Sequence, residues 1–304
     1  MENQALHPIK FTAASPRTKL SPSMPVPATS YALLVESIGV HALQLYAAAL
    51  PLLLLAVTGM WWLARRYAVP RDDAKLRPGA YLLMWLAFGF AVIVTGAVVF
   101  AELAEQLADA GTAQRIGALD TLLSATVGSH LGAGAQQVFA AITHLADTAT
   151  LAGLTAVVAA WLWVAQRRWL ALAYVGAVAG NAVLNVTLKS IFERTRPLHD
   201  TTLFQPQGWS FPSGHSSGAV VAYGMLAYVL VRAWPPAKNH ALGGLAVVLA
   251  ASALAFTIGC SRVFIQVHYA TDVLAGFSSG SVWLAMCLIS IELTRRYRQR
   301  PPAP

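Results

Sequence analysis

Residues 169–190 read WLALAYVGAVAGNAVLNVTLKS and carry no charged side chain before Lys189. A helix needs about 20 apolar residues to cross the hydrocarbon core of a bilayer. The run is continuously apolar, whereas the strands of an outer-membrane barrel alternate between apolar and polar residues. The stretch therefore predicts a transmembrane helix.

Six further apolar runs of similar length surround this one: 42–64, 80–101, 148–166, 214–233, 242–260 and 272–293. The composition agrees, because 57% of the 304 residues are hydrophobic and only 11% are charged, with a mean hydropathy of +0.56. A soluble domain carries about 25% charged residues. Only two cysteines are present, Cys260 and Cys287, too few for a disulfide framework. We expect an all-α, polytopic membrane helix bundle of about seven spans.

The net charge of +8 is typical of a nucleic-acid-binding protein, but the positions of the basic residues favour another explanation. Most of the 21 Lys and Arg residues lie beside the apolar runs, in four clusters: Arg65, Arg66, Arg71, Lys75, Arg77; Arg167, Arg168; Arg232, Lys238; and Arg295, Arg296, Arg298, Arg300. If the spans alternate in direction, all four clusters lie on one side, which the positive-inside rule assigns to the cytoplasm. The sequence thus predicts a multi-pass protein of the inner (cytoplasmic) membrane, with the bilayer and not nucleic acid as its partner.

The chain divides into four parts by composition. Residues 1–30 are rich in Pro, Ser and Thr and lack the apolar core of a signal peptide, so we expect a disordered tail. Residues 31–147 hold the first spans and an extracytoplasmic segment, 148–293 form a helical core, and 294–304 form a basic cytoplasmic tail.

The connection between the second and third spans contains an amphipathic pattern. Ile116, Leu119, Leu123 and Val127 recur every three or four residues, which predicts a helix at the bilayer surface. Such a helix either packs against the bundle or forms a rim that admits lipid from the side.

A polar stripe runs along the span at 169–190. Asn181, Asn185 and Lys189 are spaced four apart, so they share one helix face. Asparagines inside a span usually bond to a neighbouring helix, whereas an ionisable residue there is a functional candidate.

Three short clusters of polar residues fall on the side opposite the basic loops: KSIFERTRP at 189–197, GWSFPSGH at 208–215 and SRVFIQVHYATD at 261–272. Each has an ordinary explanation alone. The cations can be interfacial anchors, Ser213 can cap a helix, and the histidines can be structural. Their joint occurrence at one end of three helices favours a common site.

The residue types in these clusters suit phosphoryl transfer. Lys189, Arg196 and Arg262 supply fixed cations for the charge on the phosphate oxygens. Lys189 and Arg196 are seven apart, so they share a face if the helix continues that far. The N–H groups of Ser213 and Gly214 would form a phosphate cradle at the start of a helix.

Two histidines complete the predicted site. His268 and Asp272 are four apart, so the carboxylate can orient one ring nitrogen while the other attacks phosphorus. No acidic residue lies three or four positions from His215, and we expect it to protonate the leaving oxygen.

The pattern K-x6-R-P, P-S-G-H and S-R-x5-H-x3-D resembles the three-part signature of the type-2 phosphatidic acid phosphatase superfamily, which includes membrane lipid phosphatases and soluble vanadium haloperoxidases. The resemblance implies a six-helix core, here with an extra N-terminal span, a phosphohistidine at His268 oriented by Asp272, and His215 as general acid. It also implies that no metal or other cofactor is needed. The sequence departs from relatives at Gln266, where they often have glycine, and at Ala270, where proline is common.

We therefore expect an integral-membrane lipid phosphate phosphatase whose site faces the periplasm or exterior. Its candidate substrates are undecaprenyl diphosphate, phosphatidic acid and phosphatidylglycerol phosphate. A lipid phosphotransferase would use the same residues, and a non-catalytic lipid-binding or transport protein is a third alternative. A haloperoxidase is disfavoured because those relatives are soluble.

Overall fold

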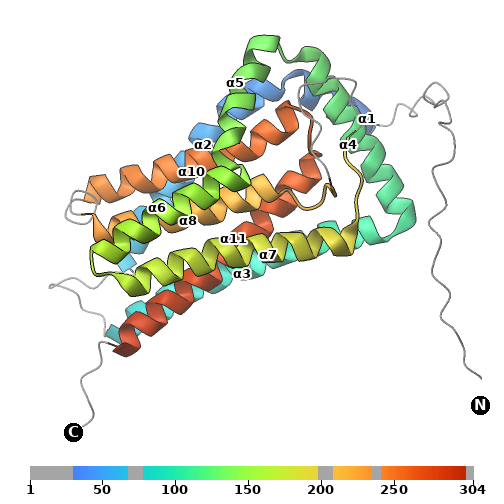
Figure 1. Ribbon diagram of the computed structural model, residues 1–304. Helices are drawn as coiled ribbons and strands as arrows, with labels where there is room; N and C mark the ends of the chain where they lie inside the picture. The colour runs from blue at the N-terminus through green and yellow to red at the C-terminus, as the bar shows by residue number, and fades with distance from the viewer. Residues whose placement is uncertain (1–29, 68–77, 198–207, 235–240, 299–304) are drawn as a thin grey trace, which may run out of the picture.

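The computed structural model describes residues 30–67, 78–197, 208–234 and 241–298, and every regular element in this part of the chain is helical (Figure 1). The elements are α1 (Ser30–Val40), α2 (Ala42–Tyr67), α3 (Pro78–Ala108), α4 (Ala110–His130), α5 (Ala133–Thr143), the 3-10 turn η1 (His144–Ala146), α6 (Thr148–Val164), α7 (Arg168–Phe192), α8 (Gly214–Ala233), α10 (Ala241–Phe264) and α11 (Ala270–Arg298). The predicted all-α architecture is confirmed. The tail predicted for residues 1–30 lies outside the described residues, apart from Ser30, which begins α1.

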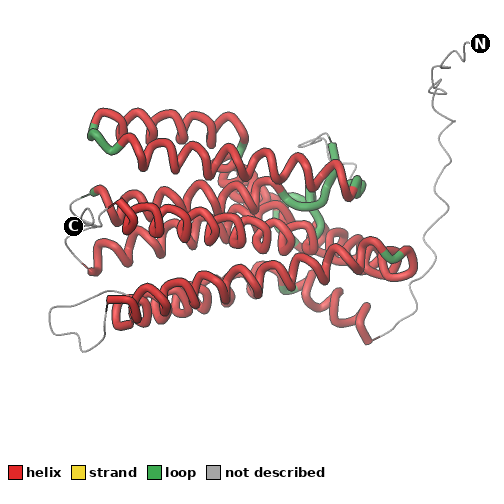
Figure 2. Tube along the Cα trace, turned by 90° about the horizontal axis from the view of Figure 1, so that it is seen from below, coloured by secondary structure: helices red, strands yellow, loops and turns green. Residues whose placement is uncertain are grey.

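Within the described residues, six helices are long and apolar enough to cross a membrane: Ala42–Arg66, Leu82–Ala108, Arg168–Phe192, Gly214–Ala233, Ala241–Phe264 and Ala270–Arg298. The remaining predicted run belongs to a bent pair, Ala133–Ala146 and Thr148–Val164, which meet at 48°. The long helices lie side by side in a bundle (Figure 2). The sequence predicts about seven spans; the described residues contain six candidates, or seven when the bent pair is counted as one.

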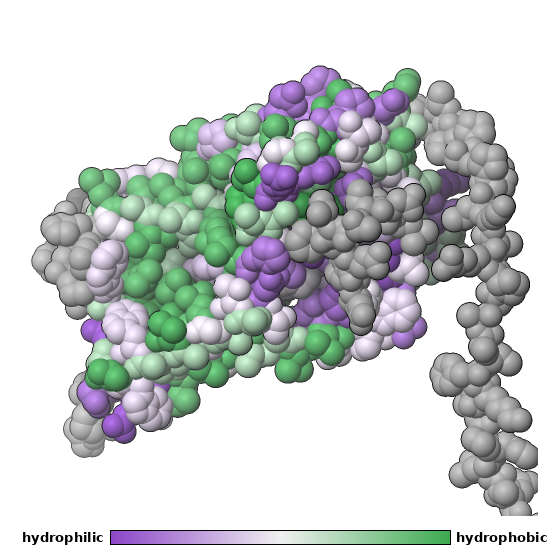
Figure 3. All heavy atoms as spheres, turned by 45° about the horizontal axis from the view of Figure 1, so that its top comes forward, coloured by the Kyte–Doolittle hydropathy of each residue, from purple (hydrophilic) through white to green (hydrophobic). Residues whose placement is uncertain are grey.

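The outer surface of the bundle is that of a membrane protein. Large apolar side chains such as Val164, Leu172 and Val183 are more than half exposed, and apolar residues dominate the middle of the face shown in Figure 3. A soluble monomer rarely exposes apolar patches on this scale. The exposed apolar band is the surface that lipid chains would cover.

The two ends of the bundle differ in their charges. The connection from α6 to α7 and the C-terminal end of α11 lie at one end, and the start of α8 lies at the other (Figure 1). The first of these ends gathers arginines from the last turns of α2, α8 and α11: Arg65, Arg66, Arg232, Arg295, Arg296 and Arg298. Helix α11 continues to Arg298 and so includes the first residues of the segment predicted as the C-terminal tail, 294–304.

Helix α8 lies at the centre and packs against α7, α10 and α11. The Tyr174 hydroxyl of α7 donates a hydrogen bond to the carbonyl of Ala222 in α8 at 3.2 Å. Gly276 allows α11 to approach the start of α8, because a Cβ atom there would lie 2.6 Å from the Ser213 carbonyl oxygen. This close approach places Asp272, one helical turn earlier, beside the beginning of α8.

The helix predicted in the 102–147 connection is present as α4. It crosses the end of the bundle opposite the arginine-rich end (Figure 1) and packs against α1. Its buried residues are Asp120, Ser124, Thr126 and Val127. Because these face protein, the structure favours the packing interpretation of this helix over a rim for lipid entry.

Candidate active site

The fold brings the three sequence clusters into one cavity of 820 Å³, at the opposite end of the bundle from the arginines in the last turns of α2, α8 and α11. Its lining includes six of the eight predicted site residues, Lys189, Arg196, Gly214, His215, Arg262 and His268, together with Asn181 and Asn185 of the polar stripe. The six site residues come from the end of α7 and the loop after it, the start of α8, the end of α10 and the turn before α11. Segments far apart in the sequence therefore form one site, as predicted.

His268 and Asp272 form the buried centre of the site. The His268 Nδ1 atom lies 3.4 Å from Asp272 Oδ2, and its Nε2 atom lies 3.0 Å from Arg196 Nη1. The Asp272 side chain is fully buried, and its Oδ2 atom also accepts hydrogen bonds from the Ser210 hydroxyl and the Tyr269 N–H. With Nδ1 facing the carboxylate, the Nε2 lone pair faces the cations and accepts a hydrogen bond from Arg196.

The surroundings of His268 keep its ring neutral. Burial, helped by the charges of Arg196 and Arg262, lowers the pKa of His268 to about 3, although the Asp272 carboxylate opposes the shift. A neutral imidazole can attack phosphorus, whereas an imidazolium cannot. The ring is therefore in its nucleophilic form at physiological pH.

The predicted cations converge, although not along one helix face. Glu193 adopts a left-handed conformation with φ 45° and ends α7 at Phe192. The condition under which Lys189 and Arg196 would share a helix face is therefore not met, since Arg196 lies in the loop after α7. Both side chains nevertheless donate to the Trp209 carbonyl oxygen, Lys189 Nζ at 2.5 Å and Arg196 Nη2 at 3.2 Å.

Arg262 is the third cation, and it is buried in the cavity wall. Its Nη1 atom donates to Thr143 Oγ1 at 2.7 Å. Its Nε atom is shielded from solvent and has no hydrogen-bond partner among the described residues. A buried donor without an acceptor is costly, so this N–H points to an anionic ligand.

The two N–H groups predicted to cradle phosphate have different environments. The Ser213 N–H donates to the Asp272 carbonyl oxygen at 2.9 Å, so it is not free for a ligand, contrary to the prediction. Ser213 is instead the N-cap of α8, and its side chain accepts from the Ser216 N–H. Gly214 keeps its place in the cavity wall, where a Cβ atom would lie only 2.8 Å from Asn185 Oδ1.

The polar stripe of α7 connects two helices. The Nδ2 atoms of Asn181 and Asn185 lie 3.5 Å and 3.4 Å from Ser217 Oγ of α8. The predicted bonding of these asparagines to a neighbouring helix is confirmed.

Sequence reasoning missed the carboxylate partner of His215. The His215 Nε2 atom lies 2.9 Å from Asp147 Oδ1, at the bend between η1 and α6. Asp147 stands at the N-cap position of α6 but makes no capping hydrogen bond with its side chain, which also contacts His144. Asp147 lies 68 residues before His215, so no local spacing in the sequence indicates that the two side chains pair.

Sequence reasoning also missed Arg194, which stands two residues before Arg196. Its Nη1 atom donates to Asp272 Oδ1 at 2.6 Å, and its Nη2 atom donates to Asp120 Oδ2 at 2.8 Å. Thr271 joins the same group through its hydroxyl, which donates to Asp120. Burial raises the pKa of the Asp120 carboxyl, against the hydrogen bonds from Thr271 and Arg194. Arg194 therefore links α4 to the carboxylate that orients His268.

The two departures from relatives have structural explanations. Gln266 has φ 57°, a left-handed conformation that glycine adopts at little cost. Its side chain donates to the Ser124 carbonyl oxygen of α4 at 2.6 Å, a contact that glycine cannot make. Ala270 is the first residue of α11, a position where proline is favoured but not required.

Replacing Arg194 should weaken both the fold and the site. Arg194→Met would leave the buried carboxylates of Asp120 and Asp272 without their shared cation, and breaking a buried pair costs about 3–5 kcal/mol. We expect a lower melting temperature in detergent and a large loss of phosphate release, with a smaller effect for Asp120→Asn. Arg115→Met, at an exposed position of α4, is the matched control. Wild-type stability and activity in Arg194→Met would contradict this role.

The comparisons with known proteins agree with the site. A model of the PAP2 superfamily matches residues 170–296, which contain all three clusters. Phosphatidylglycerophosphatase B of Bacillus subtilis (strain 168) is 34% identical over 164 residues, which cover 54% of this chain and 79% of that protein. A crystal structure described as the first transmembrane PAP2 type phosphatidylglycerolphosphate phosphatase from Bacillus subtilis aligns with a TM-score of 0.59 and 27% identity, over 69% of this chain and 98% of its own. The chain is a polytopic membrane protein that belongs to the PAP2 superfamily.

Proposed function

We propose that this protein is a membrane lipid phosphatase that removes the terminal phosphate of phosphatidylglycerol phosphate through a phosphohistidine at His268. The main support for the proposal is that the cavity has a charged part and an apolar part. Its polar end holds the three cations and both histidines, while the remainder is lined by apolar residues of α6 and α7, among them Ala152, Ala156, Val175, Val178 and Val186. A lipid phosphate has the same division between a charged headgroup and apolar chains.

The position of the apolar lining supports a substrate that stays in the bilayer. Val175 and Val186 line the cavity and are also exposed on the outer surface of α7, at 38% and 68%. The cavity therefore borders the face that lipid chains cover. The relatives named above are phosphatidylglycerophosphate phosphatases, so we rank this substrate ahead of phosphatidic acid and undecaprenyl diphosphate.

The first chemical step follows from the orientation of His268. Its Nε2 atom attacks phosphorus, a bond from Nε2 to phosphorus forms, and the bond from phosphorus to the lipid oxygen breaks. Lys189, Arg196 and the free Nε donor of Arg262 stabilise the charge on the equatorial oxygens. Asp272 stabilises the imidazolium character that develops as the ring is phosphorylated.

His215 donates a proton in the first step and accepts one in the second. Asp147 accepts a hydrogen bond from its Nε2–H, so the cationic form of His215 uses its Nδ1–H to protonate the departing lipid oxygen and becomes neutral. In the second step, the same nitrogen accepts a proton from the water that attacks the phosphohistidine, and inorganic phosphate is released.

Phosphate release from a lipid panel tests this function. The purified protein in detergent should release phosphate from phosphatidylglycerol phosphate faster than from phosphatidic acid or undecaprenyl diphosphate. His268→Ala should abolish release because the nucleophile is gone, and His215→Ala should reduce it about 10²–10⁴-fold. His41→Ala, at an exposed position of the first helices, is the control.

Three results would overturn the proposal. They are undiminished release in His268→Ala, no release from any lipid, and transfer of the phosphoryl group to an added alcohol in place of water. The last would identify a phosphotransferase.

We propose that turnover needs no metal. The cations Lys189, Arg196 and Arg262 already occupy the positions that a divalent ion would serve. Within the described ranges, no group of three His, Cys, Asp or Glu side chains is arranged to hold a metal ion. Activity should persist in excess chelator and fall with vanadate, which mimics five-coordinate phosphorus. Loss of activity in chelator that magnesium restores would refute this.

We also propose that the site faces the periplasm or exterior of an inner (cytoplasmic) membrane. The arginines at the opposite end of the bundle support this orientation through the positive-inside rule. A reporter that works only outside the cytoplasm should be silent after residue 300 and active when inserted near residue 203. The reverse pattern would invert the topology.

A further inference from the structure

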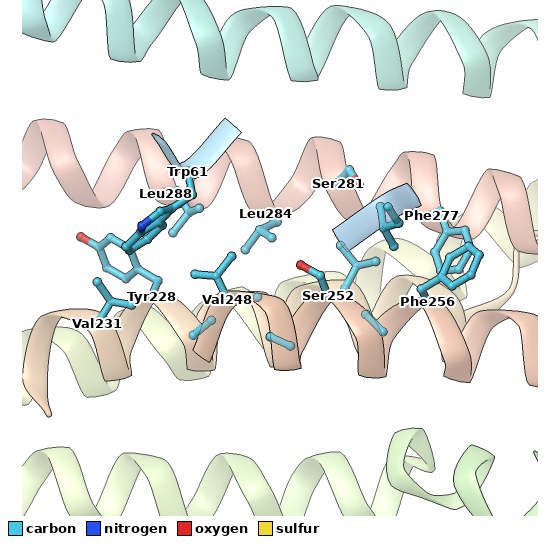
Figure 4. Close-up of a pocket in the computed structure, with 16 residues that line it drawn as sticks. Trp61, Tyr228, Val231, Val248, Ser252, Phe256, Phe277, Ser281, Leu284 and Leu288 are labelled. Carbon is cyan, nitrogen blue, oxygen red and sulfur yellow. The ribbon is translucent and has the colours of Figure 1, made fainter. Parts of the chain in front are cut away.

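A second cavity, of 580 Å³, lies between α2, α8, α10 and α11 (Figure 4). It shares no lining residue with the proposed active-site cavity, which borders α6 and α7. Its volume falls in the range of small-molecule sites, about 300–1,000 Å³. The mechanism proposed above leaves this cavity unused.

Most of the cavity wall is apolar. Val248, Phe256, Phe277 and Leu284 lie along its length in Figure 4, and the rings of Phe256 and Phe277 are stacked with centroids 6.2 Å apart. Each of these residues belongs to a helix that spans the membrane. Such a space suits a hydrocarbon chain.

The other end of the cavity contains two polar groups without partners. Trp61 and Tyr228 lie at this end in Figure 4, where the indole nitrogen and the phenol oxygen are visible. Trp61 Nε1 and Tyr228 Oη are shielded from solvent, and neither has a hydrogen-bond partner among the described residues. Buried donors of this kind are usually satisfied, so they indicate a ligand that carries a hydrogen-bond acceptor.

Positive charge surrounds these two side chains. The guanidinium of Arg65 lies 5.7 Å from the centroid of the Trp61 ring, and that of Arg232 lies 5.5 Å from the Tyr228 ring. Both arginines are in the last turns of their helices, at the arginine-rich end of the bundle.

Among the described residues at this end of the bundle, arginines outnumber carboxylates. Glu292 of α11 forms ion pairs with Arg232, Arg295 and Arg296. In the described part of the chain, one carboxylate thus serves three guanidinium groups, and Arg65 adds a further positive charge beside the cavity. Arginine near the membrane surface attracts anionic lipid headgroups.

We propose that this cavity binds one anionic phospholipid from the leaflet at the arginine-rich end. One acyl chain lies between α2, α8, α10 and α11, and the phosphate lies near Arg65 and Arg232. An ester carbonyl accepts from Trp61 Nε1 and Tyr228 Oη. This lipid is a bound component and not the substrate, because its headgroup lies at the opposite end of the bundle from His268.

The lipid would also strengthen the attachment of α2. In the described part of the chain, α2 contacts chiefly α10, with fewer contacts to α1 and α3. A chain lying in the cavity would touch α2, α8, α10 and α11 together. Binding to the folded state alone stabilises that state by mass action, so a bound lipid should raise the unfolding temperature.

Titration of the delipidated full-length protein tests the proposal. Phosphatidylglycerol should bind saturably, by native mass spectrometry, and raise the melting temperature in detergent. Phosphatidylcholine with the same acyl chains should bind more weakly, because its headgroup has no net charge. The double variant Trp61→Phe/Arg65→Gln loses one donor and one cation, so its affinity for phosphatidylglycerol should fall about tenfold or more.

Three further variants test whether the lipid binds in this cavity. Tyr228→Phe removes only the hydroxyl and should also weaken binding. Trp62→Phe, at the neighbouring exposed position, should bind like the wild type. Lys189→Met, in the proposed active site, should also bind phosphatidylglycerol normally. The proposal fails if the two lipids bind equally, if Trp61→Phe/Arg65→Gln binds like the wild type, or if Lys189→Met releases the lipid, which would place it in the active-site cavity.

Discussion

The buried carboxylate of Asp272 is the constraint on which the arrangement of the site depends. A charge withdrawn from water must be paired and hydrogen-bonded, or the fold is strongly destabilised. Asp272 meets this requirement with donors from several parts of the chain: Arg194 after α7, the Ser210 hydroxyl before α8, and His268 and the Tyr269 N–H before α11. Its carbonyl oxygen also accepts from the Ser213 N–H at the start of α8. The segments that carry the chemistry are held together because each of them donates a hydrogen bond to Asp272.

The same constraint connects structure to reactivity. Asp272 engages the Nδ1 side of His268, so the opposite nitrogen faces Arg196 and the cavity. Arg194 neutralises Asp272 from the other side and continues to Asp120, which ties α4 to the site. A helix outside the region matched by the family model therefore supports the residue that orients the proposed nucleophile.

Much of this architecture could be predicted from the sequence because the relevant signals are local. Span length follows from continuous apolar runs, and the pairing of His268 with Asp272 follows from a spacing of one helical turn. Asp147 and Arg194 were missed for the opposite reason: their partners lie 68 and 78 residues away, and no periodic pattern connects them. The end of α7 at Phe192 was missed because it depends on the left-handed conformation of Glu193. The Ser213 N–H was assigned to phosphate because its tertiary acceptor, the Asp272 carbonyl, has no signature in the sequence.

The most direct test of the account is to identify the atom that becomes phosphorylated. Rapid quenching of the enzyme during turnover, followed by peptide mapping and NMR of the phosphohistidine, distinguishes the two ring nitrogens. Because Asp272 engages Nδ1, the account predicts a phosphoryl group on Nε2 of His268. Phosphate on Nδ1 of His268, or on His215, would contradict it.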